Sequence, residues 1–173
     1  MNQKYKDVLL GLLMGVAMMG VTAFHFQRGE NPVLSIPLSQ SLNLVLIIGV
    51  VFGILKHRNS IPREVGFSYW KAFGLAMLLS LIASVCLGLF YAFLYEKNPD
   101  LVPLVVDAMK SHIEEMFKEK PAMLEMYRGV IGEMVTPAFI GFSGAFSVMM
   151  GAVLPSLIIS LFFRRRAVVN ESL

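Results

Sequence analysis

The chain has 173 residues, of which 56% are hydrophobic and 16% are charged, whereas typical soluble domains have about 45–50% and about 25%. This composition excludes an ordinary soluble domain and favours a single integral membrane domain over residues 1–173. The net charge of +3 does not indicate a nucleic-acid-binding protein, because the basic residues flank long uncharged stretches instead of forming one patch.

Four long stretches of the chain contain no charged residue, namely 8–27, 32–55, 72–95 and 134–163. A helix needs about 20 apolar residues to cross a hydrocarbon core about 30 Å thick, because each residue adds about 1.5 Å. Each stretch is long enough. The sequence therefore predicts an all-α membrane protein with four transmembrane helices, over about residues 8–27, 36–55, 70–95 and 137–163.

The first two predicted spans each carry a pair of glycines four residues apart. These pairs are Gly11 with Gly15 in the first span and Gly49 with Gly53 in the second. Helices in lipid associate through close packing, and small residues at this spacing let two backbones approach each other. We therefore predict that both pairs lie at helix–helix contacts. The apolar run of the first span is longer than the roughly 7–15 residues of a secretory signal, so we expect it to be retained.

The third predicted span has a small residue at every fourth position. The members of this small-residue stripe are Ser68, Ala72, Ala76, Ser80, Ser84, Gly88 and Ala92. Positions four apart drift slowly around a helix, so the stripe suits a right-handed crossing near −40°. The pattern predicts that this helix is the centre of the bundle. The alternative is that the same face docks on a helix of another protein.

The segment between the third and fourth spans has an amphipathic pattern. Apolar residues recur at Val102, Val106, Met109 and Ile113, and charged residues occupy the opposite side. This period predicts a helical segment over about residues 100–135 outside the membrane, broken at Pro121. Its methionine-rich side suits adaptable contact with a protein partner. Burial of the same side against lipid or against the protein's own spans is favoured over contact with a protein partner.

The fourth predicted span contains small residues, two prolines and a basic end. Gly144 and Gly151 lie among serines that share their face, and we predict that they take part in helix packing. Pro137 suits a first helical turn, and Pro155 predicts a kink. The span is followed by three arginines, Arg164, Arg165 and Arg166. They are expected to attract anionic lipid headgroups by about 1 kcal/mol each.

The charges at the ends of the spans predict the orientation of the chain. Basic residues dominate the two termini and the loop between the second and third spans, whereas in the other two loops taken together nine carboxylates outnumber six basic residues. Because basic loops stay in the cytoplasm, both termini are expected to be cytoplasmic. We accordingly expect a multi-pass protein of the bacterial inner membrane.

His112, Glu115 and Glu119 form the one cluster outside the spans that resembles a metal or catalytic site. A di-iron bundle needs Glu-x-x-His motifs from two helices, and the sequence does not supply such a pair. It also lacks the His-Glu-x-x-His and Cys-x-x-Cys patterns. We interpret the cluster as a solvated charged face and expect no catalytic residue, metal or cofactor. His25 and His57 have no evident acid–base partner in the sequence.

The layout of the chain resembles a known family of small bacterial membrane proteins. The matching features are "GFSYWKAF" at the third span, "YEKNPD" after it, the acidic methionine-rich segment and "LIISLFFRRR" at the end. Together they resemble the domain of unknown function 4199 family, common among Bacteroidota. The resemblance covers nearly the whole chain and implies four spans in the inner membrane. That family has no established activity, so the resemblance implies no site.

The sequence supports two main hypotheses about function. Abundant packing features and absent catalytic motifs favour a non-enzymatic accessory or scaffold subunit. Its expected partners are membrane lipids and either another membrane protein or further copies of itself. The alternative is a small transporter or oligomeric pore, with Pro155 and the serines within the spans lining a path. A proton-coupled pump is disfavoured, because none of the spans has an ionisable residue at mid-depth. Asn43 is the most polar residue within a span.

Overall fold

The structure is a computed structural model that describes residues 3–62, 64–118 and 121–166. Within these residues the chain is helical, apart from loops and one antiparallel bridge between Phe67 and Arg165. The elements are α1 (Gln3–Gln27), α2 (Ile36–Ser60), α3 (Tyr69–Lys97), the short 3-10 helix η1 (Pro99–Leu101), α4 (Val102–Met116), α5 (Pro121–Met134) and α6 (Pro137–Phe163). The predicted all-α class is confirmed.

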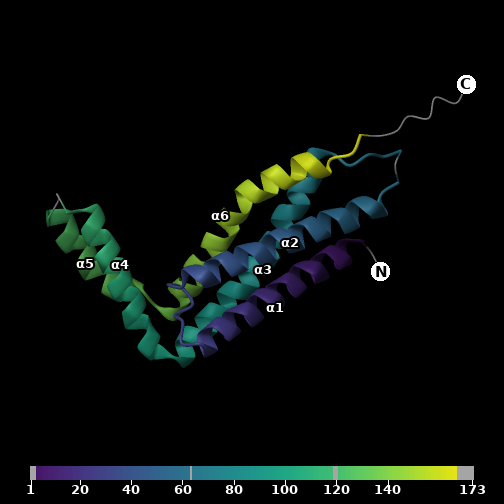
Figure 1. The fold of residues 1–173 in the computed structure, drawn as a ribbon. Coiled ribbons are helices and arrows are strands. Elements are labelled where there is room, and N and C mark those ends of the chain that lie inside the picture. The colour runs from purple at the N-terminus through teal and green to yellow at the C-terminus, as the bar shows by residue number, and fades with distance from the viewer. Residues whose placement is uncertain (1–2, 63, 119–120, 167–173) are drawn as a thin grey trace, which may run out of the picture.

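Four of these helices, α1, α2, α3 and α6, are long and apolar enough to cross a membrane. Their most apolar windows have mean hydropathies of 1.9, 2.1, 2.4 and 2.1. The four helices lie side by side as one bundle, with the start of α1 and the end of α6 at one end and α4 and α5 at the other (Figure 1). The predicted four candidate spans are therefore confirmed, and we refer below to the terminal end and the hairpin end of the bundle.

Side-chain caps fix where three of the spanning helices begin. Ser35 Oγ accepts the Leu38 N–H at 3.3 Å before α2, and Thr136 Oγ1 accepts the Phe139 N–H at 3.2 Å before α6. Ser68 caps α3 in the same way, so it precedes the helix instead of lying within the small-residue stripe. Such caps satisfy amide groups that the helix itself leaves unpaired.

Helix α3 is the centre of the bundle, as the small-residue stripe predicts. It contacts α1, α2 and α6, and its interface with α6 is the largest between any two helices of the described chain. Its most apolar window is 44% buried, compared with 28%, 33% and 17% for α1, α2 and α6. The other side of each helix exposes large apolar residues such as Ile48, Leu89 and Phe142. In lipid these side chains meet acyl chains, so their exposure fits a membrane protein.

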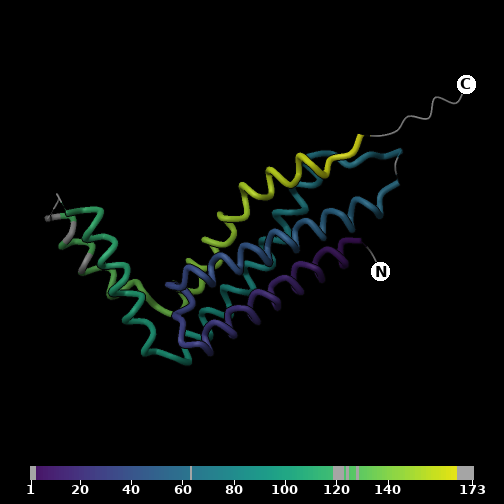
Figure 2. The backbone as a smooth tube through the Cα atoms, viewed as in Figure 1, coloured from purple at the N-terminus to yellow at the C-terminus, as the bar shows by residue number. Residues whose placement is uncertain are grey.

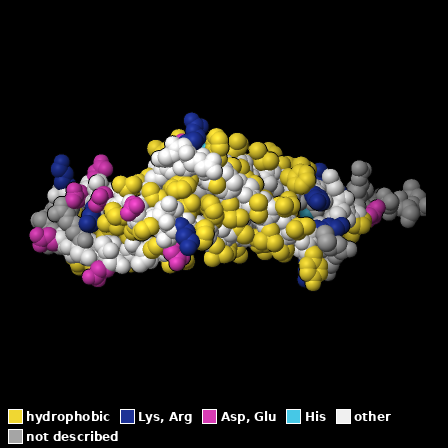
Figure 3. All heavy atoms as spheres, turned by 90° about the horizontal axis from the view of Figure 1, so that it is seen from below, with side chains coloured by type: hydrophobic (Ala, Val, Ile, Leu, Met, Phe, Trp, Pro, Cys, Tyr) yellow, Lys and Arg dark blue, Asp and Glu magenta, His cyan; other side chains and the backbone are white. Residues whose placement is uncertain are grey.

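Helices α4 and α5 pack against each other as a hairpin that extends sideways from the bundle (Figures 1 and 2). A second cluster of buried residues joins the base of the hairpin to the ends of α3 and α6; it includes Tyr95, Val105, Ile131 and Ile140. The rings of Phe117 and Tyr127 stack near its tip, with centroids 5.2 Å apart. Seen from below, hydrophobic side chains cover the middle of the molecule and acidic ones gather on the hairpin (Figure 3).

Candidate functional site

The crossing of α3 and α6 brings the backbones of two helices into close approach. A Cβ built on Gly88 would lie 2.7 Å from Ala145 Cβ and 2.7 Å from the carbonyl oxygen of Gly141. A Cβ built on Gly141 would lie 2.5 Å from the Gly88 carbonyl oxygen and 2.8 Å from Ala92 Cβ. Since real Cβ atoms do not approach other atoms this closely, the crossing needs glycine on both helices. Gly141 was not among the residues singled out from the sequence.

The glycine pairs of α1 and α2 also lie between helices. A Cβ on Gly11 would lie 2.9 Å from Ile82 Cβ, and one on Gly15 would lie 2.6 Å from Cys86 Cβ. On α2, Gly49 faces the Met14 side chain and Gly53 faces that of Leu79. The predicted stripe residues Ala76, Ser80 and Ser84 are buried on α3.

The two small residues predicted on α6 have different surroundings. A Cβ on Gly144 would lie 2.5 Å from Cδ2 of the Tyr91 ring, so this glycine makes room for the tyrosine. Gly151, by contrast, is exposed, and the only described atom within 4 Å of its built Cβ is Asn43 Oδ1, at 3.7 Å. It therefore lines an opening between α2 and α6 and makes no tight helix crossing.

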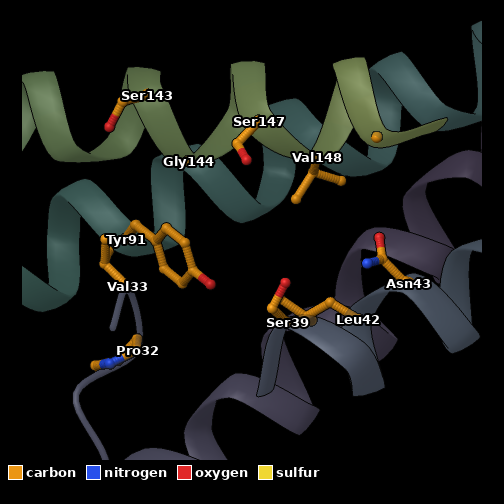
Figure 4. A pocket seen from close by; sticks show the side chains of 11 residues that line it. Pro32, Val33, Ser39, Leu42, Asn43, Tyr91, Ser143, Gly144, Ser147 and Val148 are labelled. Atoms are coloured by element: carbon orange, nitrogen blue, oxygen red, sulfur yellow. The ribbon is translucent and has the colours of Figure 1, made fainter. Parts of the chain in front are cut away.

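This opening, the α2–α6 groove, has a volume of about 370 Å³. Side chains of α2, α3, α6 and the loop before α2 surround it (Figure 4). The lining residues that bring polar side chains are Ser39, Asn43, Tyr91, Ser143 and Ser147, and Leu42 and Val148 add apolar surface. Sites for small ligands commonly enclose about 300–1,000 Å³, so the groove is large enough to hold a small ligand.

Some polar groups of the groove have a hydrogen-bond partner within the described chain, and others have none. The Tyr91 side chain is held by packing, with 4% exposure of the residue, and its hydroxyl points into the groove (Figure 4). It also approaches Thr22 of α1, although the buried Thr22 Oγ1 has no partner at good hydrogen-bond geometry. Ser143 Oγ donates to the Ile140 carbonyl at 3.0 Å. Asn43 is exposed, and its amide has no partner among the described residues.

The groove lies at the hairpin end of the bundle and closes toward the terminal end. Beyond it, Leu46, Val50 and Ile54 of α2 are buried, as are Ala152 and Ser156 of α6. A solute could therefore enter the groove but could not pass through one copy of this conformation. Pro155 lies within this closed part, and α6 continues through it as a helix.

The sequence model of the family described as "Protein of unknown function (DUF4199)" matches residues 8–165. The chain belongs to the DUF4199 family. The match covers all four spans and the hairpin of this DUF4199 chain. A search of curated proteins found no match to it. A search of solved structures found none either.

At the terminal end of the DUF4199 chain, Arg165 ties the end of α6 to the loop between α2 and α3. Its Nη2 donates to the carbonyls of Ile61, at 2.7 Å, and Pro62, at 3.0 Å. Its backbone pairs with Phe67 in both directions, at 2.7 and 2.8 Å. Arg164 and Arg166 are exposed beside it. Of the three predicted headgroup ligands, Arg164 and Arg166 are thus the more available to lipid, and lipid binding by all three stays a prediction.

Two histidines of the DUF4199 chain have acidic partners that the sequence did not reveal. His57 Nδ1 lies 3.0 Å from Asp7 Oδ2, and Gln3 Nε2 donates to the other Asp7 oxygen at 3.1 Å. His25 Nδ1 lies 2.9 Å from Glu30 Oε2. The interpretation that neither histidine has an evident acid–base partner is therefore corrected for both residues. Asp7 and His57 are fifty residues apart, and only the packing of α1 on α2 brings them together.

Glu30 lies in the loop between α1 and α2, outside the spans. Two hydrogen bonds lower the pKa of its carboxyl below the ordinary 4.5. The larger effect comes from the Ser35 hydroxyl and the smaller one from His25. The same loop is held on α3 by the Tyr95 hydroxyl, which donates to Asn31 Oδ1. The ionised carboxylate therefore connects His25, at the end of α1, with Ser35, just before α2.

We expect this carboxylate to stabilise the fold at neutral pH. Because its folded pKa is lowered, the contribution is present above the unfolded value of 4.5 and is lost as the pH falls through the folded value. Glu30→Gln should therefore lower the melting temperature in detergent at pH 7, and its difference from the wild type should shrink in acid. The matched variant Glu96→Gln changes an exposed carboxylate that has no hydrogen bond within the described chain. A Glu30→Gln deficit that was the same at neutral pH and at every acidic pH tested would contradict the assignment.

The hairpin carries the cluster that resembled a metal site. His112 and Glu115 are exposed on α4, whereas Glu119 lies outside the described residues. No group of three potential metal ligands occurs among the described side chains.

The hairpin also has an apolar surface on α5, the methionine face, formed by Met123, Met126, Tyr127, Val130 and Met134. All five residues are exposed, by 38% to 59%.

Proposed function

We propose that this protein is a non-enzymatic accessory subunit of the bacterial inner membrane, with both termini in the cytoplasm. In this proposal the hairpin binds a membrane-protein partner on the opposite side of the membrane, while the four spans form a close-packed base. The methionine face is the observation that carries the proposal. Its residues follow a helical period along one side of α5 and remain exposed after the chain has folded.

The composition of the methionine face suits a protein contact. Methionine side chains are flexible and polarizable, so they adapt to the shape of a partner. Exposed apolar patches outside the spans commonly mark interaction sites. The face is continuous over Met123, Met126 and Val130, and Tyr127 lies beside these residues. The expected partner surface is therefore apolar and concave.

The charge around the methionine face indicates which charge the partner should carry around its apolar contact surface. In α4 and α5 the carboxylates outnumber the basic residues, with Asp107, Glu114, Glu115, Glu125 and Glu133 against Lys110 and Arg128. Two such hairpins would repel each other, and so would a hairpin and anionic lipid headgroups. A partner with basic residues around an apolar groove would be attracted instead. We therefore favour a different membrane protein over a second copy.

Photocrosslinking in intact cells tests this proposal. A benzoylphenylalanine at position 126 should produce one discrete adduct with another membrane protein. The same group at position 125 should not, because Glu125 lies on the opposite side of α5 by the helical period. Val130→Glu should abolish the adduct by placing a charge on the methionine face. Adducts only with a second copy of this chain, or only with lipid, would overturn the proposal.

The α2–α6 groove supports a second candidate function, a small transporter or oligomeric pore. Its serines and Asn43 give a polar surface within the spans. The groove closes at the buried residues Leu46, Val50 and Ala152, so transport would require α6 to move or several copies to join. Solute flux into proteoliposomes above that of empty vesicles, lost on Ser147→Leu, would establish this alternative.

A further inference from the structure

We infer that the α2–α6 groove is a binding site for an uncharged lipid with hydroxyl and ester groups, of the diacylglycerol class. The lipid's oxygen atoms would pair with the polar side chains of the groove, and its acyl chains would lie along the outer wall of the bundle. This inference goes beyond the proposed function, because it concerns the spans and not the hairpin.

The groove has polar groups at hydrocarbon depth. The uncharged part of α2 from residue 36 to residue 55 is about 30 Å long, which matches the hydrocarbon core. By the rise of the helix, Ser39 lies about 5 Å and Asn43 about 10 Å from the hairpin end of this part. On α6, Ser147 lies ten residues after Pro137, at a depth of about 15 Å. The groove therefore extends from near the interface to the middle of the bilayer.

At this depth an unpaired amide is costly, because the surrounding acyl chains offer it no hydrogen bond. The Asn43 amide has no partner among the described residues. Ser39 and Ser147 are exposed beside it, and their hydroxyls also make no hydrogen bond within the described part of the chain. A ligand that supplies both donors and acceptors would remove this cost. The hydroxyl and ester groups of an uncharged lipid supply both.

The chemistry of the lining selects against a charged ligand. Its polar groups are hydroxyls and one amide, and no Lys, Arg, His, Asp or Glu is among its described residues. A phosphate brought to the depth of Asn43 would lose its hydration without gaining a counter-charge. The arginines Arg164 and Arg166 lie at the terminal end, away from the groove. Anionic phospholipids are therefore expected to bind at that end and not in the groove.

The shape of the groove fits a ligand that enters from the bilayer. The exposure of Ser39, Asn43, Ser147 and Gly151 shows that the groove opens through the wall of the bundle. Tyr91 closes its inner side, with its hydroxyl directed at the space between α2 and α6 (Figure 4). Leu42 and Val148 supply apolar surface for an acyl chain. A lipid can therefore reach the tyrosine hydroxyl without leaving the membrane.

Photolabelling of the protein in nanodiscs tests the inference. One probe is a diacylglycerol with a diazirine in an acyl chain, and the other is a phosphatidylglycerol with the same chain. The diacylglycerol should label α2 and α6, and an excess of unlabelled dioleoylglycerol should compete with it. Asn43→Leu should lower this labelling about tenfold, since it removes hydrogen bonds to the ligand.

The controls separate loss of binding from loss of folding. Gln40→Leu makes the same change from amide to leucine at an exposed position of α2 that does not line the groove, and it should leave labelling unchanged. Ser147→Leu fills the groove from α6 and should reduce labelling while the melting temperature stays that of the wild type. Equal labelling by phosphatidylglycerol, or labelling unaffected by Asn43→Leu and Ser147→Leu, would overturn the inference. So would a dimer that dissociates on Asn43→Leu, because the amides would then pair across copies.

Discussion

Replacement of Gly88 by leucine is expected to separate α3 from α6 and to unfold the bundle at temperatures where the wild type is intact. The built Cβ already lies 2.7 Å from the Gly141 carbonyl oxygen, so backbone, and not a flexible side chain, stands in its way. Overpacking of a core costs about 1–3 kcal/mol when side chains can adjust, and here a whole helix must move. We expect a loss of more than about 3 kcal/mol in the free energy of unfolding.

The measurement is the unfolding of the purified protein in detergent, followed by circular dichroism and gel filtration. Gly74→Leu is the matched control, because it makes the same change on α3 where a built Cβ meets no described atom within 4 Å. That variant should be as stable as the wild type or slightly more stable, since leucine favours helix more than glycine does. Equal stability of the Gly88 and Gly74 variants would show that the α3–α6 crossing is not what holds the bundle together.

Removal of the His57 imidazole is the second change with a large expected effect. Asp7 is a mostly buried carboxylate, with 12% exposure of its side chain, and His57 is its nearest basic partner, at 3.0 Å. His57→Leu leaves that carboxylate with only the Gln3 amide. Exposed pairs contribute about 0–1 kcal/mol and the breaking of a buried pair costs about 3–5 kcal/mol. For this partly buried pair we expect a loss of about 2 kcal/mol.

A double-mutant cycle separates the pair from the general effect of each substitution. Asp7→Asn removes the charge with little change of shape, so the double variant Asp7→Asn with His57→Leu should recover part of the loss. Stabilities are compared by thermal unfolding at neutral pH in one detergent. If the two substitutions add without coupling, the contact between Asp7 and His57 contributes nothing specific to the packing of α1 on α2.

The architecture could be predicted from the sequence because uncharged stretches report directly on the hydrocarbon core. The uncharged stretches did not predict where all of the helices begin and end. Helix α1 begins at Gln3 and α2 continues to Ser60, beyond the uncharged stretches. Residues such as Lys4 and Lys56 are good helix formers, so a helix continues through them into water even though they do not belong in lipid. Charge thus marks the membrane boundary and not the end of the helix.

The groove was less accessible to sequence reasoning. Ser143, Ser147 and Gly151 recur every fourth residue, which suggests a packing face, and Gly144 beside them does face the Tyr91 ring. Whether such a face meets a helix or an opening depends on how far α2 diverges from α6, and that is set by the packing of both helices on α3. The contact between Asp7 and His57 follows the same rule, because no spacing connects residues on different helices. Asn43 and the serines within the spans were the polar signals visible in advance.

The extensive contact between α3 and α6 has a consequence for the order in which the protein is made. Helix α6 follows the other three spans along the chain, and it is also the helix with which α3 forms its largest interface. Helices α1, α2 and α3 can pack as soon as they enter the bilayer, whereas the Gly88 side of α3 must wait until the hairpin and α6 have been made. During that interval the half-made protein presents an open glycine surface to the membrane. The packing of α6 on α3 is therefore the step that closes the four-helix bundle.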